Sequence, residues 1–345
     1  MSQAAFRVPS NPTVAVVGAT GAVGREIMTC LEKRSFPMAR LRLLASARSS
    51  GQSLPFRQQA VVVETLDEQS LKDVDIALFS AGSGISKKFV PAAGSRTLMI
   101  DNSSAFRMGE KVPLVIPEIN GSMAFTHSGI ISNPNCTAII MAMALWPLHC
   151  QVPIRRVFGS TYQAASGAGA AAMEELRLST KAHLAGQSFT PRVMPHPYAF
   201  NVFSHNDTVD PASGNNGEEI KAMQELRKIM GHPELRIGLT CVRVPVLRAH
   251  LVVTSVEFER PMKPEMAREI LSGAPGVRIV DDRAGNHFPM PIEATGQDDV
   301  LAGRFRPDYG DPSGHTISMM LAGDQLLKGA ALNAVQIAEL VSGRG

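Results

Sequence analysis

The chain has 345 residues, of which 44% are apolar and 19% charged, and its formal net charge is +3. This length allows two domains with a large core, and the composition is that of a globular protein rather than a disordered or fibrous one. The small and dispersed positive charge argues against nucleic acid and against a membrane surface, and no apolar run reaches the roughly 20 residues that span a bilayer. Neither nucleic acid nor a membrane is therefore expected as a partner.

The N-terminus and the spacing of the cysteines indicate the cellular compartment in which the protein is found. Residues 1–12 lack an apolar core long enough for a signal peptide, so they predict a short loose tail. The cysteines at positions 30, 136, 150 and 241 show no CxxC spacing, which argues against a zinc site and against a disulfide framework. We expect a cytoplasmic protein without a bound metal.

A dinucleotide site is predicted at the start of the chain. Thr13–Val17 has the β-branched composition of a buried strand, and a glycine turn and a helical stretch over 26–34 follow it. Such a turn lets the backbone approach a pyrophosphate, whose charge is met by the helix N-terminus. The spacing is GxxGxxG rather than GxGxxG, through Gly18, Gly21 and Gly24, and a plain turn is the alternative.

The second predicted strand, 41–45, favours NADP as the cofactor. An acidic residue about 20 positions after the glycines would hold the ribose of NAD, yet no acid occurs between Lys33 and Glu64. The strand is instead followed by Ser46, Arg48 and Ser49, and a guanidinium beside hydroxyls suits a 2′-phosphate. A solvated loop arginine is the alternative.

Further strands are predicted at 75–79, 98–101 and 113–116, and a flexible loop that starts at Ser80 is placed to cover a cofactor. Strands that alternate with helical stretches indicate a parallel, doubly wound sheet. The first predicted domain, residues 1–135, is thus a Rossmann-type α/β fold.

Cys136 is the candidate nucleophile. It precedes an apolar run, 137–148, that predicts a helix buried on nearly every face, with Asn135 as its N-cap. A thiol in the first turn of a helix ionises more readily, and the thiolate is the reactive form. From these residues alone, a buried cysteine that only fills space is the favoured alternative.

The middle of the chain predicts an α+β domain. A strand over 156–162 runs into a small-residue loop, 163–170, in which Gln163 is able to donate to a carbonyl oxygen, and a helix extends to about His183. Residues 184–216 are polar and rich in proline, and they contain His196, His205 and Asp207 without metal-ligand spacing. We interpret them as a surface excursion suited to an oligomer contact.

Two pairs of polar residues follow. Glu218 and Lys221 lie on one face of a predicted helix that ends near Met230, where a surface ion pair is the simplest interpretation. Residues 240–250 resemble a strand that bears Arg243, suited to a carboxylate, and His250, suited to proton transfer near neutrality. A structural histidine is the alternative, unless a thiol lies beside it in space.

Nearly the whole chain resembles the aspartate-β-semialdehyde dehydrogenase family in its bacterial, NADP-dependent form. The resemblance is carried, in the family's order, by VAVVGATGAVG, LASARSSG, DIALFSAGS, DNSSAFR, VPLVIPEIN, SNPNC, STYQAASGAG, TCVRVPVLRAH and LLKGAALNAVQIAE. It implies the reversible, NADPH-dependent reduction of aspartyl phosphate to aspartate semialdehyde through a cysteine thioester. This step serves the biosynthesis of lysine, diaminopimelate, threonine, methionine and isoleucine.

The resemblance also implies roles for individual residues. Cys136 would form the thioester and His250 would act as the acid and base, while the substrate would be bound by Gln163, Arg243 and Glu218. Phosphate would be bound by Arg107, Lys221 and Asn135. The implied cofactor contacts are Gly18, Ala19, Thr20, Gly21, Ala22, Val23, Gly24, Ser46, Arg48, Ser49, Ser80, Ser166, Gly167 and Asn333.

Arg248 departs from the family pattern, which has a small residue such as serine there. We hypothesise that this extra cation lowers the pKa of His250. The expected architecture is a cofactor domain over 1–135, a catalytic and dimerisation domain with a mixed sheet over 136–320, and a C-terminal helix over 321–345, starting near Gly323, that returns to the first domain. A homodimer is expected.

Three alternatives share part of this evidence. A related reductase of an N-acylated glutamyl phosphate or of a sugar phosphate would have the same thiol, histidine and cofactor. A dinucleotide-sensing regulator would keep the fold without turnover. A cysteine hydrolase would leave the glycine turn unexplained.

Overall fold

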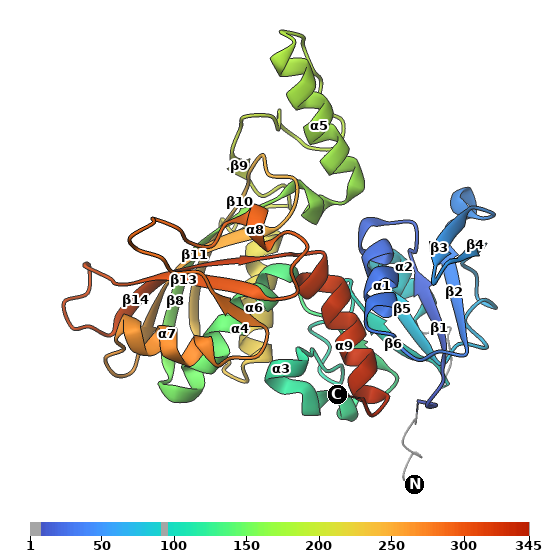
Figure 1. Ribbon diagram of the computed structural model, residues 1–345, viewed down its shortest axis with the longest axis horizontal. Coiled ribbons are helices and arrows are strands. Elements are labelled where there is room, and N and C mark those ends of the chain that lie inside the picture. Colours follow the sequence, from blue (N-terminus) through green and yellow to red (C-terminus); the bar gives the residue numbers. More distant parts are fainter. Residues whose placement is uncertain (1–7, 91–95, 345) are drawn as a thin grey trace. The chain divides into compact units, whose positions relative to one another are not determined.

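The computed structural model describes residues 8–90 and 96–344 (Figure 1). The chain forms two compact units, one containing the residues up to Asn135 together with those from Ala330 onward, and the other containing Cys136–Gly329. Of the predicted tail, residues 1–7 lie outside the described residues. Val8 is buried, and the carbonyl of Pro12 accepts a hydrogen bond from Ala39 N–H at 3.0 Å.

The first unit is built on a seven-stranded sheet in the order β3-β4-β2-β1-β5-β6-β7. All neighbouring strands are parallel except β3 and β4, which form an antiparallel pair at one edge. The strands are β1 (Thr13–Val17), β2 (Arg40–Ala45), β3 (Ser53–Phe56), β4 (Gln59–Thr65), β5 (Ile76–Phe79), β6 (Leu98–Asp101) and β7 (Ile130–Ser132). Strands β1, β5 and β6 are almost wholly buried and mostly apolar, as parallel strands covered on both faces are.

Helices of the first unit accompany this sheet. They are α1 (Ala22–Lys33), α2 (Ser83–Phe89), α3 (Pro117–Asn120) and α9 (Leu332–Val341), with 3₁₀ turns at Ala47–Ser49 and Gly121–Thr126. Helix α9 packs against α1 and also contacts β5 and β6. An ion pair of 2.7 Å between Arg34 and Glu339 joins the ends of the two helices.

The strand predicted at 113–116 does not form. Only Leu114 makes a bridge, to Ser132 of β7. Pro113 has no N–H to give to a ladder, and the side chain of Asn120 takes the place of a neighbouring strand, since it accepts from Ile116 N–H at 2.9 Å and donates to the Leu114 carbonyl at 2.9 Å.

The second unit contains a mixed seven-stranded sheet in the order β12-β13-β14-β11-β8-β10-β9. Its strands are β8 (Ile154–Gln163), β9 (Phe203–Ser204), β10 (Arg236–Arg243), β11 (His250–Phe258), β12 (Val277–Ile279), β13 (Val300–Pro307) and β14 (Thr316–Gly323). Strand β8 is parallel to β10 and antiparallel to β11. The two sheets together confirm the predicted fold class.

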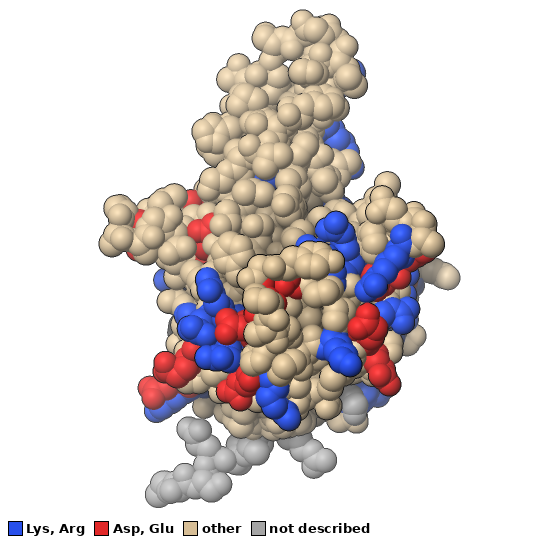
Figure 2. Space-filling model, turned by 90° about the vertical axis from the view of Figure 1, so that its left-hand side faces the viewer, with Lys and Arg blue, Asp and Glu red and all other residues tan. Residues whose placement is uncertain are grey.

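The helices of the second unit are α4 (Cys136–Gln151), α5 (Ala170–Leu184), α6 (Gly217–Ile229), α7 (Pro264–Ser272) and α8 (Pro291–Ala294). Helix α4 packs on α6 and α7 and contacts β8, β13 and β14, so residues on all its faces are buried, as the apolar run predicts. Helix α5 instead projects away from the sheet (Figure 1). In Figure 2 this projection shows few charged side chains on the face in view.

Two predicted elements differ in extent from the observed ones. Residues 240–250 are not one strand, because β10 ends at Arg243 and β11 begins at His250. The predicted helix from Gly323 starts later: a turn follows β14, then a π-helical turn at Leu327–Ala331, and then α9. The carboxylate of Asp324 accepts from Leu326 N–H at 3.0 Å, which stabilises this turn in place of a helix start.

None of the helices in the described ranges has both the length and the apolar character needed to cross a bilayer.

Candidate active site

The glycine turn of the first unit has a backbone that only glycine suits. Gly18 has a φ of +84° and donates to the Leu44 carbonyl at 2.8 Å, and a Cβ on it would lie 2.8 Å from the Ser80 carbonyl oxygen. A Cβ on Gly24 would lie 2.2 Å from the Gly18 carbonyl oxygen. Gly21 immediately precedes α1. The turn therefore brings bare backbone to the helix N-terminus, an arrangement that fits a pyrophosphate.

The end of β2 carries the predicted 2′-phosphate residues. Ser46 and Arg48 are exposed, and Ser49 lies 3.4 Å from the hydroxyl of Thr20 in the glycine turn. Glu64, the next acid along the chain, is bound by both ends of the Arg42 guanidinium, at 3.1 and 2.5 Å. That pairing lowers the pKa of Glu64 and occupies its carboxylate.

Arg107 and Asn333 lie within the interior of the first unit. Arg107 is 8% exposed and donates from Nε to the Asn133 carbonyl at 3.0 Å and from Nη2 to the Asn102 carbonyl at 2.7 Å. Asn333 is fully buried, and its amide donates to the Val115 carbonyl and to the side chain of Asn133. A cofactor contact by Asn333 stays a prediction.

Cys136 is the first residue of α4 and directly follows the buried Asn135. It is partly exposed. In the second unit it lies close to Gly329, since a Cβ on that glycine would approach the Cys136 Cβ to 3.0 Å. Gln163, the last residue of β8, donates to the hydroxyl of Thr137 at 3.0 Å and so reaches the residue beside the thiol.

His250 is completely buried, and its Nδ1 accepts the Ala164 N–H at 3.1 Å. A neutral imidazole whose Nδ1 accepts carries its proton on Nε2. Nε2 has no hydrogen-bond partner among the described residues. Burial and then the charge of Arg243 lower the pKa of His250 to about 3. The ring is therefore a neutral group with one unused N–H donor.

Gln163 and Ala164 bring these groups to one strand end. The Gln163 side chain contacts Thr137, next to the thiol, while the following backbone N–H holds His250. Gly167 lies against the histidine, because a Cβ on it would approach both the His250 ring and the Arg243 guanidinium to 3.1 Å. Ser166 is bound by Gln325, whose other end accepts from Ala249 N–H at 2.9 Å.

Arg243, at the end of β10, is 3% exposed. Its Nε donates to the Asn206 side chain at 2.9 Å and its Nη1 donates to the Ala164 carbonyl at 3.1 Å. Burial lowers its pKa, but an arginine stays charged at any physiological pH. Of its five N–H donors, those on Nη2 and the second one on Nη1 have no partner among the described residues.

Glu218 and Lys221 form an ion pair in which Glu218 is buried and Lys221 is partly buried, rather than the surface ion pair of the simplest interpretation. Glu218 is 5% exposed, accepts from Gln163 at 3.3 Å and lies 3.4 Å from Lys221. Lys221 also donates to Asp207 at 2.7 Å. Burial works to lower the pKa of Lys221, but Glu218 and the bond to Asp207 outweigh it and raise that pKa.

Residues 205–207 are functional neighbours that sequence reasoning missed. They belong to the excursion interpreted as a surface segment, yet His205 is buried and Asn206 and Asp207 bind Arg243 and Lys221. Burial and Arg243 lower the pKa of His205 to about 4. The signal available in the sequence was the run of polar residues 204–208, which directly follows the apolar pair 202–203.

The effect of Arg248 on the pKa of His250 stays a hypothesis, and Arg248 is paired elsewhere. Its Nε binds the carboxylate of Asp324 at 2.7 Å, and Asp324 is fully buried. The two charges balance, and the lowered pKa of His250 has burial and Arg243 as its main causes. Asp324 also accepts from Gly296 N–H at 2.7 Å, so the pair anchors the turn after β14.

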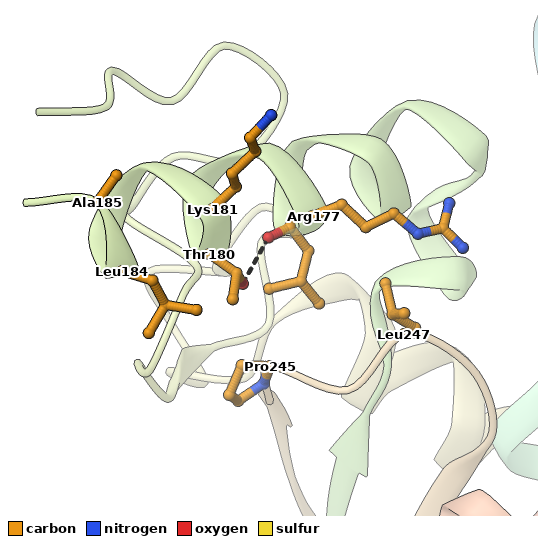
Figure 3. Close-up of a pocket in the computed structure, with 8 residues that line it drawn as sticks. Arg177, Thr180, Lys181, Leu184, Ala185, Pro245 and Leu247 are labelled. Atoms are coloured by element: carbon orange, nitrogen blue, oxygen red, sulfur yellow. Dashed lines mark hydrogen bonds between the residues drawn. The ribbon is translucent and has the colours of Figure 1, made fainter. Parts of the chain in front are cut away.

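A pocket of about 660 Å³ lies under α5 (Figure 3). Its lining combines Leu184, Pro245 and Leu247 with Arg177 and Lys181, so it does not include the thiol or the histidine. Among the described residues, no group of three or more histidines, cysteines and acids is arranged to hold a metal ion.

Comparison with known proteins agrees with this arrangement. Residues 13–126 match the family model "Semialdehyde dehydrogenase, NAD binding domain", and residues 145–328 match "Semialdehyde dehydrogenase, dimerisation domain". The chain is 49% identical over 343 residues to the aspartate-semialdehyde dehydrogenase of Synechocystis sp., covering 98% of this chain and 99% of that protein. It is 42% identical to that of Bacillus subtilis, covering 94% and 96%.

Solved structures give the same result. The crystal structure of aspartate semialdehyde dehydrogenase II from Vibrio cholerae, complexed with ASA, superposes with a TM-score of 0.92 at 38% identity and covers 96% of this chain and 98% of that one. The Candida albicans enzyme, solved with NADP, shares the fold with a TM-score of 0.71 at 20% identity over 97% and 99% of the two chains. The chain therefore belongs to the aspartate-semialdehyde dehydrogenase family.

Proposed function

We propose that this protein reduces L-4-aspartyl phosphate to L-aspartate 4-semialdehyde with NADPH, reversibly and through a thioester on Cys136, as a cytoplasmic step of amino-acid biosynthesis. The observation that carries the proposal is the joining of Cys136 and His250 to the end of β8: Gln163 binds the residue next to the thiol, and Ala164 binds the imidazole. The products of this step would feed the lysine, diaminopimelate, threonine, methionine and isoleucine pathways.

NADP fits the residues of the first unit. The cradle at Gly18 and Gly24 has no room for a Cβ, which suits the close approach of a pyrophosphate. Arg48 and the serines at 46 and 49 would hold the 2′-phosphate, and Glu64 is occupied by Arg42 and so does not offer the carboxylate that NAD requires. When bound, NADPH supplies the hydride for reduction of the thioester.

Cys136 would act as the nucleophile. Its thiolate attacks the carbonyl carbon of the acyl phosphate, the bond from that carbon to the phosphate oxygen breaks, and inorganic phosphate leaves. The thiolate is favoured by its place in the first turn of α4, where the positive end of the helix dipole meets negative charge. The resulting thioester divides one difficult step into two easier ones.

His250 would supply and recover a proton. Its Nε2–H is directed by the Ala164 N–H bond at the opposite nitrogen. We assign to it the donation of a proton to the carbonyl oxygen when that oxygen becomes negative after reduction of the thioester. When the carbon–sulfur bond then breaks, the proton returns to Nε2 and the aldehyde leaves. The lowered pKa keeps the ring neutral at the start of each cycle, with its one proton on Nε2, where it is available to that oxygen.

The remaining polar residues would hold the two ends of the substrate. The unused donors of Arg243 suit the α-carboxylate, and Glu218, held by Gln163, suits the α-amine. Lys221 and Arg107, with Asn135, would bind the phosphate. The bond to Thr137 holds the Gln163 side chain beside the residue next to the thiol. From there Gln163 would keep the acyl carbon of the substrate beside the thiol. Ser166, Gly167 and Asn333 remain proposed cofactor contacts.

A second copy of the chain is the proposed partner. Large apolar side chains are exposed on and after α5, including Leu178 (48%), Leu184 (74%) and Phe200 (63%). Apolar surface gathered on a projecting element marks an association site more often than a solvated face. A two-fold dimer that covers this segment agrees with the description of the matching family domain and is the commonest closed oligomer.

One assay tests the proposed function. Oxidation of NADPH is followed with aspartyl phosphate as substrate, for the wild type and for Cys136→Ala. We expect the wild type to turn over and the variant to lose at least about 10⁴-fold in rate, because nothing else supplies the thioester. NADPH binding, measured by fluorescence titration, should be unchanged in the variant.

The controls separate the related reactions. N-acetylglutamyl phosphate and glyceraldehyde-type acyl phosphates should support less than a hundredth of the rate. Equal rates with these substrates would contradict the assignment of aspartyl phosphate, and a Cys136→Ala variant that still turns over would contradict the thioester.

A further inference from the structure

Two consecutive residues of the excursion after α5, Asn206 and Asp207, each contact a charged group of the candidate site. Strand β9 pairs with the end of β10, so that Phe203 lies opposite Arg243 and Ser204 opposite Val242. His205 N–H then donates to the Cys241 carbonyl at 2.9 Å. This pairing fixes where the chain leaves the sheet, and the next two side chains therefore have defined positions.

Asn206 determines which donors of Arg243 are available. Its side-chain oxygen accepts from Nε at 2.9 Å, and the Ala164 carbonyl accepts from Nη1 at 3.1 Å. A guanidinium has five N–H groups, and its planar shape transmits the orientation of one edge to the other. With Nε occupied, the end formed by Nη2 and the remaining Nη1–H is the one left for a carboxylate.

Asp207 determines in the same way which donors of the Lys221 ammonium group are available. Its Oδ2 accepts from Nζ at 2.7 Å, while Glu218 lies 3.4 Å from the same nitrogen. An ammonium group has three donors, so one remains. Asp207 approaches α6 closely because Gly217, the first residue of that helix, has no side chain: a Cβ there would lie 2.7 Å from Oδ2. The Gly217 N–H donates to the Thr208 carbonyl and holds the segment in place.

We propose that Asn206 and Asp207 are positioning residues with separate tasks, Asn206 aiming the carboxylate-binding edge of Arg243 and Asp207 aiming the phosphate-binding ammonium of Lys221. This inference rests on the proposed function and deepens it. The excursion thus sets the distance between the two anionic ends of the substrate that the site accepts. Two residues one peptide bond apart control two different binding constants.

The test is a crossed pattern of Michaelis constants in the oxidative direction, with aspartate semialdehyde, inorganic phosphate and NADP. Asn206→Ala should raise KM for the semialdehyde about tenfold and leave KM for phosphate within about twofold. Asp207→Asn should do the reverse. Asn206→Asp keeps an acceptor for Nε and should restore the semialdehyde KM to within about threefold of the wild type.

Matched controls come from the same excursion. Asp210→Asn makes the same change of charge three residues from Asp207, at a carboxylate that bonds only to its own turn at Ala212 and Ser213. Asn201→Ala removes an amide that binds the Pro197 carbonyl. Both should leave the two Michaelis constants within about twofold. Thermal unfolding of all variants verifies that they are folded.

A double variant tests whether Asn206 acts through Arg243. If it does, Asn206→Ala adds little to the effect of Arg243→Lys, because the aimed guanidinium is already gone. Multiplicative effects of the two substitutions would overturn the proposal. So would a rise of the same constant in Asn206→Ala and Asp207→Asn, or a loss of kcat in both with unchanged KM.

Failure of the proposed function can be distinguished from failure of the positioning proposal. A folded wild type that forms no NADPH with semialdehyde and phosphate contradicts the activity itself. Calorimetric binding of inorganic phosphate and of L-aspartate then decides the positioning. A roughly tenfold loss for phosphate in Asp207→Asn alone, and for aspartate in Asn206→Ala alone, supports it, and equal affinities in variants and controls overturn it.

Discussion

The glycine turn of the first unit and the strand-end cluster of the second, the two proposed binding sites, are built by opposite means. The turn uses seven consecutive residues, and its properties come from backbone: a φ of +84° at Gly18 and a Cβ-free approach of Gly24 to the Gly18 carbonyl. The cluster uses side chains from β8, β10, β11, α4, α6 and the excursion. Each of these side chains is held by a partner that is distant in the sequence. Binding by backbone tolerates few substitutions but needs little support, whereas binding by side chains depends on every supporting contact.

This difference has a consequence for mutational effects. A substitution in the turn should act on one ligand, the cofactor, through local strain. A substitution in the cluster should spread to several ligands, because Gln163, Glu218 and Lys221 share hydrogen bonds and charge. The separate tasks inferred for Asn206 and Asp207 are the exception, since they lie at the outer ends of that network.

Among the substitutions that test this comparison, Arg243→Lys should have the largest effect. A lysine keeps the charge but loses the planar fork and the bonds to Asn206 and Ala164, so KM for aspartate semialdehyde should rise by about 10²-fold, as the loss of two charge-assisted bonds implies. Steady-state kinetics with varied semialdehyde measures it. The affinity for NADPH serves as the internal control. A variant with wild-type KM would contradict the assignment of Arg243 to the carboxylate.

Gly18→Ala should weaken NADPH binding by about tenfold or more, since both the left-handed backbone and the 2.8 Å approach to Ser80 oppose a Cβ. Gly129→Ala is the matched control, because Gly129 also has a positive φ, +98°, but has open space around it. Fluorescence titration with NADPH gives the affinities. Equal losses in the two variants would mean that backbone strain alone, without the close approach, explains the effect.

Arg48→Ala is expected to raise the dissociation constant of NADPH about tenfold and to leave that of NADH unchanged, because only the 2′-phosphate would be lost as a partner. Arg40, exposed at the opposite end of β2, provides the control substitution. If both cofactors weaken together, Arg48 supports the loop rather than the phosphate.

The smallest effect is the pH dependence of stability in the second unit. Burial, with Arg243, lowers the pKa of His250 to about 3 and that of His205 to about 4. Between these values and the ordinary 6.5, the unfolded chain binds more protons than the folded one, so stability is complete above about pH 6.5 and falls as the pH is lowered. Each histidine should remove about 1 kcal/mol between pH 7 and 5.5.

Urea unfolding measures this loss, followed by the fluorescence of Trp146, the single tryptophan, which lies in α4 of the second unit. His205→Gln should reduce the loss by about half. His196→Gln changes an exposed histidine of the same excursion and should leave it unaltered. An identical pH dependence in all three proteins would show that His205 is protonated without cost in the folded state.

Much of the architecture follows from local patterns in the sequence. The strand at 13–17, the glycine turn and the buried helix that begins at Cys136 were all predictable, because a strand, a turn or a helix is encoded by neighbouring residues. The strand expected at 113–116 was wrong because its apolar run is opposed by a proline and by the side chain of Asn120, seven residues after that proline.

The sequence by itself determined the family, the cofactor turn and the types of side chain that the chemistry needs. Only the tertiary structure decided which of them meet. The bonds that set the site join residues 37 apart at Asn206 and Arg243, 86 apart at Ala164 and His250, and 76 apart at Arg248 and Asp324. No local periodicity encodes such pairs, because they form only when strands from separate parts of the chain are aligned in one sheet. The proton position on His250, the balanced charge of Arg248 and the recruitment of residues 205–207 all follow from that alignment.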